Sequence, residues 1–194
     1  MPRKYELKRR ATAQARTRQR IVEAAVALHT TIGPTRTTVS AIAERAGVQR
    51  HTVYNHFPDE RSLGLACSGL FVEQNPLPEP AAWLRIADGE RRLRRGLAEL
   101  YAYFEANADQ LAPILRDSEV DPLVRQLLDH RITPHMTGIR DVLAGPFAAR
   151  ATAKARLLGV LDVFVSPQTW RLLSSRLSRE DIIEAAVRAV RCQQ

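Results

Sequence analysis

The stretch TTVSAIAERAGVQRHTVYNHF, residues 37–57, predicts two short helices joined by a tight turn. Thr38 is a typical N-cap, because its hydroxyl can accept a hydrogen bond from an unpaired amide of the first helical turn. Apolar residues then follow at helical spacing until Gly47, which is suited to end a helix. A further helix begins near Gln49 or Arg50. Two short helices around a Gly-containing turn are typical of a helix-turn-helix.

A longer supporting helix is predicted before this pair. Ile21, Ala25, Leu28 and Ile32 follow one another at spacings of four, three and four, which places them on one helix face. Gly33-Pro34 supplies a left-handed residue and a helix breaker, so we expect the helix to stop there. Residues 1–15 are charged but lack an apolar stripe, and we expect them to form a basic flexible arm.

The positive charge is confined to this part of the chain. The whole sequence has a formal net charge of +8, and residues 1–57 hold 11 Lys and Arg against three acids. Residues 58–194 hold equal numbers of basic and acidic residues. A polyanionic partner for the N-terminal third explains this division, since Lys and Arg that neutralise phosphates release counterions. The alternative is that a basic tail only improves solubility.

The second short helix has an outward face rich in hydrogen-bond donors. Arg50, His51 and Tyr54 can share that face, whereas Val53 and Phe57 point inward. In the major groove, Arg can bond bidentately to guanine, and Asn or Gln to adenine. The sequence therefore predicts a DNA-reading surface, whose residues are Thr38, Gln49, Arg50, His51, Thr52, Tyr54, Asn55 and His56. An ordinary polar surface helix is the alternative.

At these residues the sequence resembles the tetracycline-repressor (TetR) family of transcription regulators. The matching motifs are Thr38, Ile42-Ala43, Ala46-Gly47-Val48, Thr52-Val53-Tyr54, His56-Phe57 and Leu63, and the gapless match covers about the first 70 residues. The resemblance implies a homodimeric, all-helical regulator, usually a repressor, with a C-terminal domain that binds a small effector. It also implies that Arg50, His51 and Tyr54 read bases, and that Thr38, Thr52 and His56 contact the DNA backbone.

Two positions depart from the family pattern. The family commonly has a Lys that contacts phosphate near the start of the fourth helix, where this chain has Glu60 followed by Arg61. The recognition helix often begins with Ser, a good N-cap, and here Gln49 takes that place. A missing cap costs on the order of 1 kcal/mol, so we expect this helix to be only marginally stable without DNA.

The rest of the chain also predicts helices, so the expected fold class is all-α. Asp59 can cap a fourth helix that runs to about Asn75, and the expected helices beyond it are Trp83–Ala106, Ala108–Leu115, Pro122–Leu143, Ala148–Val165 and Arg179–Val190. Ser178 begins a capping box for the last helix. We therefore expect an arm over residues 1–15, a helix-turn-helix domain over 16–58, and an effector-binding and dimerisation domain over 59–194.

The last two expected helices are apolar on more than one side. Leu157, Leu161 and Phe164 form one stripe, Ala151, Ala155 and Leu158 form another, and residues 182–190 are apolar over a wide arc. A surface helix needs only one buried stripe. We expect a subunit interface here, consistent with a homodimer; the alternative is that both helices lie centrally in a monomer core.

An effector pocket is expected among aromatic and polarisable residues of the C-terminal region. The candidates are Trp83, Tyr101, Tyr103, Phe104, His130, Met136, Phe164 and Trp170. Aromatic residues on helices are also common in an ordinary core, so each candidate has a purely structural alternative.

Other functional classes have little support in the sequence. No phosphate loop, zinc-protease motif or nucleophile elbow is present, so we expect neither an enzyme nor a cofactor. The spacings between histidines do not favour a metal site, and Asp117, Glu119 and Asp121 are interpreted as solvated helix-end acids. Only two cysteines and no long apolar run are present, so we expect a cytoplasmic protein without a membrane span. An architectural DNA-binding protein without effector, and a helical enzyme or carrier with a basic arm, remain as alternatives.

Overall fold

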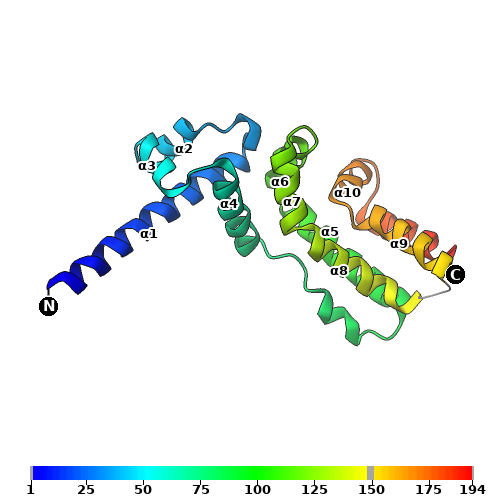
Figure 1. Cartoon of the computed structure of the whole chain (residues 1–194). Coiled ribbons are helices and arrows are strands. Elements are labelled where there is room, and N and C mark those ends of the chain that lie inside the picture. The colour runs from blue at the N-terminus through cyan, green and yellow to red at the C-terminus, as the bar shows by residue number, and fades with distance from the viewer. Residues whose placement is uncertain (1, 148–150, 194) are drawn as a thin grey trace. The chain divides into compact units, whose positions relative to one another are not determined.

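The computed structural model describes residues 2–147 and 151–193, and every regular element in these ranges is a helix (Figure 1). The predicted all-α fold is therefore confirmed. Within the described ranges, no helix is both long enough and apolar enough to cross a membrane. The α-helices are α1 Pro2–His29, α2 Val39–Ala46, α3 Arg50–His56, α4 Glu60–Gln74, α5 Gly89–Ala106, α6 Ala108–Ser118, α7 Pro122–Arg131, α8 Thr133–Ala144, α9 Ala151–Val165, α10 Pro167–Ser174 and α11 Arg179–Arg191. Three short 3₁₀ helices are η1 Pro34–Arg36, η2 Pro80–Arg85 and η3 Gly145–Phe147.

The contacts divide the chain into two units, each formed by two segments. Unit 1 comprises Met1–Asn75 and Asp109–Arg131, and unit 2 comprises Pro76–Ala108 and Ile132–Gln194. This division differs from the domain boundary expected after residue 58. Helix α4 packs against both α1 and α7, because its buried face carries Leu63, Cys67 and Phe71 and its Gly64 lies against Leu127. The fourth helix and the segment 109–131 therefore belong with the helix-turn-helix.

The core of unit 1 follows the pattern predicted from the sequence. Ile21 and Ala25 of α1 are fully buried and pack in one cluster with Ile42 of α2 and Val53 of α3. The Oγ1 atom of Thr38 accepts from the backbone N–H of Ala41 at 3.1 Å, which confirms the predicted cap. Gly47 ends α2 in the left-handed conformation, with φ of 62°, as expected.

The N-terminal residues differ from the expected flexible arm, because the structure includes residues 2–15 in α1. The segment from Lys8 to Arg20 contains mostly Ala, Arg and Gln, which are strong helix formers, and no Gly or Pro. A stripe of apolar residues indicates that a helix packs against a core, and an exposed helix needs no such stripe. The absence of a stripe therefore did not exclude a helix. Nearly all side chains from Lys8 to Arg20 are exposed, and α1 extends well beyond the other helices of its unit (Figure 1).

Asp117 at the end of α6 is buried, which corrects its interpretation as a solvated acid. Its side chain is only 2% exposed, and its Oδ2 atom accepts from the backbone N–H of Thr35 at 2.9 Å and from the Thr35 hydroxyl at 2.7 Å. Arg116 forms an ion pair with Asp117 at 2.7 Å and donates to the carbonyl of Ile32 at 2.9 Å. Helix α6 is thus bound to the turn between α1 and α2.

The protonation states at this contact follow from its geometry. Burial alone would raise the pKa of Asp117, but the hydrogen bonds from Thr35 and Arg116 lower it below its ordinary value. Burial lowers the pKa of His29 to about 4, although the Asp117 carboxylate acts in the opposite direction. His29 is therefore uncharged at neutral pH, and the buried carboxylate depends on Thr35 and Arg116 for its compensation.

Unit 2 is built around α5, which contacts α8, α9 and α11. Leu93, Leu97, Leu100 and Tyr101 of α5 are fully buried. Helix α11 lies along α5, and three ion pairs connect them or their ends: Arg94 with Glu184, Arg179 with Glu105, and Arg191 with Glu90.

The sequence predicted a subunit interface at the last two helices. The wide apolar arc of α11 is instead buried within its own chain. Ile182, Ile183, Ala186, Val187 and Val190 are each at most 8% exposed. For this helix the structure therefore supports the alternative of a position inside one chain's core. Helix α9 differs. Its stripe of Leu157 and Leu161 is buried, whereas Ala155 and Val163 on another face are exposed.

The other boundaries differ from expectation where capping residues break a helix. The expected helix Trp83–Ala106 is divided into η2 and α5, because the Asp88 side chain caps α5 by accepting from the Arg91 amide at 2.6 Å. The expected helix Pro122–Leu143 is divided at Ile132, before Pro134. Helix α10 was not predicted, although its Ser166 cap and Pro167 are ordinary start signals.

We expect Gly33→Ala to destabilise unit 1 far more than Gly47→Ala. Gly33 has φ of 97° and ψ of 154°, a region that essentially only glycine adopts. A Cβ there would lie 2.3 Å from both Arg116 Nη2 and Asp117 Oδ2, whereas a Cβ at Gly47 meets nothing within 4 Å. Urea unfolding should show a loss of about 3 kcal/mol for Gly33→Ala and about 1 kcal/mol for Gly47→Ala. Equal losses would contradict this account of the turn.

Candidate nucleic-acid interface

Helix α3 presents the predicted face to solvent. Val53 is 1% exposed and the following Phe57 is 3% exposed, so these two side chains attach the helix to the core. Arg50, His51 and Tyr54 are all exposed, and Tyr54 retains 48% of its accessible area. An aromatic side chain this exposed is unusual for a structural role, and here it adjoins a guanidinium and an imidazole.

The turn before α3 determines how the helix leaves α2. The left-handed Gly47 is followed by Val48, whose backbone N–H donates to the carbonyl of Ala43 at 2.9 Å. At the start of α3 the Gln49 side chain makes no capping hydrogen bond, as expected. The Thr52 amide donates to the carbonyl of Gln49 at 2.9 Å, so of the first-turn amides those of Arg50 and His51 have no partner from a side-chain cap.

A cation–π contact supports the far end of α3. The guanidinium carbon of Arg18 in α1 lies 4.7 Å from the centre of the Phe57 ring. This contact connects the exposed part of α1 to the residue that anchors α3. Arg18 is therefore a further candidate for the interface, which the sequence analysis did not include. Its position three residues after Ala15 and four after Gln14, on one helix face, was a visible signal.

The eight predicted DNA-contact residues all lie in unit 1. Gln49 and the residues from Arg50 to His56 belong to α3 and its cap, with Thr52 and His56 half-buried and Asn55 exposed. Thr38 is exposed at the start of α2. Their contacts with DNA remain a prediction.

At the start of α4, Glu60 and Arg61 stand where the family commonly has a phosphate-binding Lys, and the structure shows what each of them does. Arg61 donates from Nη1 to Oε1 of Gln126 on α7, at 2.8 Å, so its guanidinium is engaged within unit 1. Glu60 is exposed. In this arrangement Arg61 connects α4 to α7 instead of pointing freely to solvent.

The predicted effector residues are only partly brought together. The Phe104 ring lies 5.5 Å from the Trp170 ring, tilted by 45°, and also contacts the rings of Tyr101 and Tyr103. These four rings form an aromatic cluster of unit 2, and Phe164 is connected to it through its backbone carbonyl, which accepts from the Tyr101 hydroxyl at 3.0 Å.

The other three candidates lie apart from the aromatic cluster. Trp83 is buried under α5 and donates to Glu99 at 2.8 Å, and Met136 is half-buried on α8. His130 is exposed on α7 and belongs to unit 1, so the structure gives no support for grouping it with the others.

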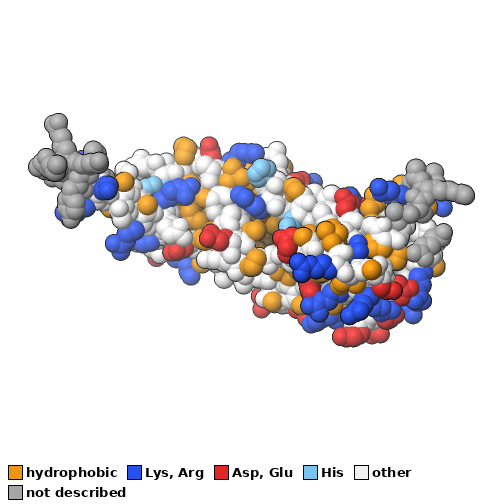
Figure 2. Space-filling view, turned by 90° about the horizontal axis from the view of Figure 1, so that it is seen from below, with side chains coloured by type: hydrophobic (Ala, Val, Ile, Leu, Met, Phe, Trp, Pro, Cys, Tyr) orange, Lys and Arg blue, Asp and Glu red, His pale blue; other side chains and the backbone are white. Residues whose placement is uncertain are grey.

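The excess of positive charge lies in the N-terminal helices and not in unit 1 as a whole, because residues 58–75 and 109–131 of that unit contain more acids than bases. Figure 2 shows Lys and Arg predominating over acidic side chains in the part that contains the N-terminal helices, whereas both signs intermix over unit 2. Among the described residues, no group of three or more His, Cys, Asp or Glu is arranged to hold a metal ion.

Comparison with known proteins identifies the N-terminal domain. Residues 21–67 match the family model described as bacterial regulatory proteins, tetR family. This range contains the last third of α1, all of α2 and α3 and the first half of α4, so the predicted resemblance of the helix-turn-helix to this family is confirmed. No curated protein sequence matches the chain.

Solved structures of similar fold cover about nine-tenths of the chain. A Mesorhizobium loti protein described as a TetR-family transcriptional regulator has a TM-score of 0.60 and 19% identity, covering 93% of this chain and 96% of its own. FadR from Thermus thermophilus, solved with lauroyl-CoA, has a TM-score of 0.57 and 20% identity, covering 89% and 92%. FadR from Bacillus subtilis, solved with stearoyl-CoA, has a TM-score of 0.55 and 17% identity, covering 89% and 96%.

Removing the exposed side chains of α3 should abolish sequence preference without unfolding the domain. We expect Arg50→Ala or Tyr54→Ala to reduce the discrimination between operator and random duplex by about 1–3 kcal/mol. Fluorescence anisotropy with both duplexes measures this difference, and circular dichroism checks the fold. Arg176→Ala and Leu84→Ala, which change exposed side chains of unit 2, serve as matched controls. Unchanged discrimination in both α3 variants would remove these residues from the reading surface.

Proposed function

We propose that this chain, whose residues 21–67 match the tetR family model, is a homodimeric repressor that releases its operator when a small molecule binds unit 2. The observation that supports this most directly is the exposed face of Arg50, His51 and Tyr54 on a short helix. That helix belongs to the part of the chain with the entire excess of positive charge. Base-edge donors next to phosphate-neutralising cations are what sequence-specific DNA binding requires.

Two copies would present two recognition helices to a near-palindromic operator. In dimeric helix-turn-helix proteins, successive half-sites lie about 34–36 Å apart, one turn of the duplex. Each α3 would then enter one major groove, while Thr38, Thr52 and His56 contact the strand beside it.

Helix α9 is the part of unit 2 best suited to join the two copies. Ala155, Gly159 and Val163 are exposed at successive spacings of four, and Val163 retains 50% of its accessible area. Small residues on such a stripe allow a second helix to approach closely. The opposite stripe of α9 is already used in the core, so the exposed one is free for a symmetric contact.

The effector site is proposed at the aromatic cluster of unit 2. Trp170 is 8% exposed, and its Nε1–H is buried without a hydrogen-bond partner among the described residues. A buried unsatisfied donor is costly unless a ligand or water accepts from it. Two proteins of this fold were solved with fatty acyl-CoA molecules, so we propose an effector with an apolar part and an acceptor for Trp170.

Release of DNA requires that the effector distinguish two conformations. A hundredfold loss of operator affinity needs an effector that binds the released conformation about 2.7 kcal/mol more tightly than the DNA-bound one. The chain passes between the two units after Asn75, after Ala108 and after Arg131. We propose that these connections, with α4 and α6, transmit the change to the reading helices.

The test is selection of the purified protein against random duplex DNA at two salt concentrations, followed by sequencing of the bound pool. A palindromic motif that persists at the higher salt supports the proposal. A pool without a motif, with binding that disappears in salt, would indicate an architectural protein instead. Lauroyl-CoA and stearoyl-CoA are the first probes for release of the selected operator, and Trp170→Phe is the variant that should lose their effect.

Introducing a charge on the exposed face of α9 should dissociate the dimer. We expect Val163→Arg to shift the protein to monomer in sedimentation velocity and to weaken operator binding, because one chain then engages only one half-site. Val120→Arg is the control, since Val120 is also an exposed valine, with 76% of its area accessible, and lies outside unit 2. A Val163→Arg variant that remains dimeric would exclude α9 from the interface.

A further inference from the structure

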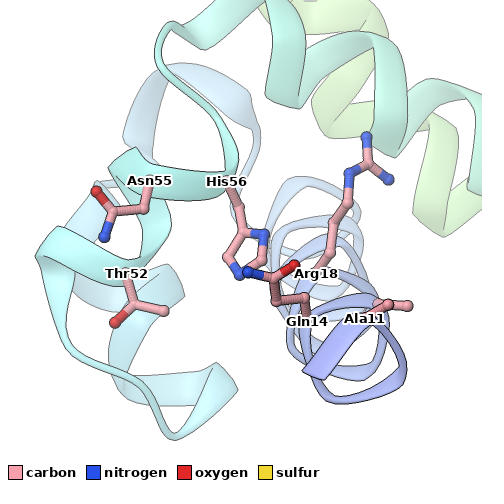
Figure 3. A pocket seen from close by; sticks show the side chains of 7 residues that line it. Ala11, Gln14, Arg18, Thr52, Asn55 and His56 are labelled. Carbon is pink, nitrogen blue, oxygen red and sulfur yellow. The ribbon is translucent and has the colours of Figure 1, made fainter. Parts of the chain in front are cut away.

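An open groove lies between the N-terminal half of α1 and the flank of α3 (Figure 3). It measures about 510 Å³ and is entirely within unit 1. One wall is formed by Ala11, Gln14, Ala15 and Arg18 of α1, and the other by Thr52, Asn55 and His56 of α3. In Figure 3, Gln14 and His56 reach toward each other from the two helices.

The two walls are regular helix faces rather than accidental neighbours. Residues at spacings of three and four lie on one side of a helix, and both sets of lining residues have that spacing. On α3 this side differs from the reading side, which carries Arg50, His51 and Tyr54, and from the buried side of Val53 and Phe57. The seven residues of α3 thus present three separate faces.

The groove is chemically suited to a phosphodiester. Its polar lining consists of a hydroxyl, two amides, an imidazole and one guanidinium, without any carboxylate. Among the described residues, the side chains of Gln14, Asn55 and His56 make no hydrogen bond with one another or with the rest of the chain. Neutral donors with one cation bind phosphate oxygens without selecting a base.

The exposed part of α1 buries almost no side-chain surface. The segment from Lys8 to Arg20 contains six basic residues and no acid, and nearly all of its side chains are exposed. A helix that buries no apolar face is marginally stable by itself. A polyanion lying along the segment would neutralise its charge and hold it in place.

We propose that this groove holds one sugar–phosphate strand of the operator, the strand bordering the major groove that α3 enters. Ala11 and Ala15 provide the space for the strand, Gln14 donates to its phosphates from α1, and Thr52, Asn55 and His56 donate from α3. Arg18, whose guanidinium lies over the Phe57 ring, contributes positive charge at the wall of the groove. The inference rests on the proposed DNA binding and adds a second helix to it. It predicts contacts that increase affinity for every duplex without changing which sequence is preferred.

Filling the groove without changing its charge tests the proposal. In the double variant Ala11→Leu, Ala15→Leu, two larger side chains occupy the strand's space on an exposed helix that tolerates Leu well. The control is Ala13→Leu, the same exchange at an exposed position on the opposite side of α1. Affinities for the selected operator and for a random duplex of equal length are measured by anisotropy, with circular dichroism as the check on folding.

The double variant should bind both duplexes about tenfold more weakly, as expected from losing one or two hydrogen bonds to phosphate. Its preferred sequence should not change, and Ala13→Leu should remain within about twofold of the unmodified protein. Unchanged affinity of the double variant would overturn the proposal. A loss confined to the operator would also overturn it, because the groove would then read bases.

A second measurement does not depend on how the double variant folds. Ethylation of single phosphates should block binding of the unmodified protein at positions flanking each half-site, and Gln14→Ala should relieve the block at one of them. An interference pattern identical in both proteins would contradict a contact from α1. If the unmodified protein binds no duplex at all, the proposed function fails, and this outcome differs from binding that is indifferent to the groove.

Discussion

The buried carboxylate of Asp117 is the contact on which the arrangement of unit 1 depends. It accepts two hydrogen bonds from Thr35 and pairs with Arg116, whose guanidinium also reaches the carbonyl of Ile32. The turn between α1 and α2 is thereby fixed from a segment far along the chain. A carboxylate with 2% of its side chain exposed is tolerated only when such partners are present. The glycine at position 33 is a consequence, since a side chain there would displace both Arg116 and Asp117.

Asp117 lies in the segment 109–131, which belongs to unit 1 although the segments before and after it in the chain belong to unit 2. The two units are therefore joined by three chain connections instead of one. The α6 end of this segment holds the start of the helix-turn-helix, and α7 contacts α4 through Arg61 and Gln126. A movement of α6 or α7 would therefore act on the elements that precede and follow α3 in the chain, which gives the proposed regulation by unit 2 a physical route.

Helix ends could be predicted from neighbouring residues, whereas contacts between residues far apart in the sequence could not. Thr38, Asp59 and Ser178 are caps because each side chain accepts from an amide three residues later, which the sequence reveals directly. The bond between Thr35 and Asp117 spans 82 residues, and an acid beside other acids gives no sign that it is buried. The apolar arc of α11 was equally ambiguous, because a helix packed by its own chain and one packed by a partner have the same pattern. The N-terminal half of α1 gives no apolar periodicity, because almost all of its side chains from Lys8 to Arg20 are exposed. Only its helix-forming composition indicates a helix there.

The reading helix itself is unusual in how little stabilises it. Helix α3 has seven residues, no side-chain cap, and only Val53 and the adjoining Phe57 in the core. Isolated helices of this length do not persist in water, so its geometry derives from tertiary contacts. One of these contacts is the guanidinium of Arg18 over the Phe57 ring, which comes from the same face of α1 that lines the groove. A strand that occupied this groove would be held by α1 and α3 together, and its binding would order the helix that reads the adjacent bases. Because this ordering depends on the phosphate strand and not on the bases, it would strengthen binding to every duplex alike.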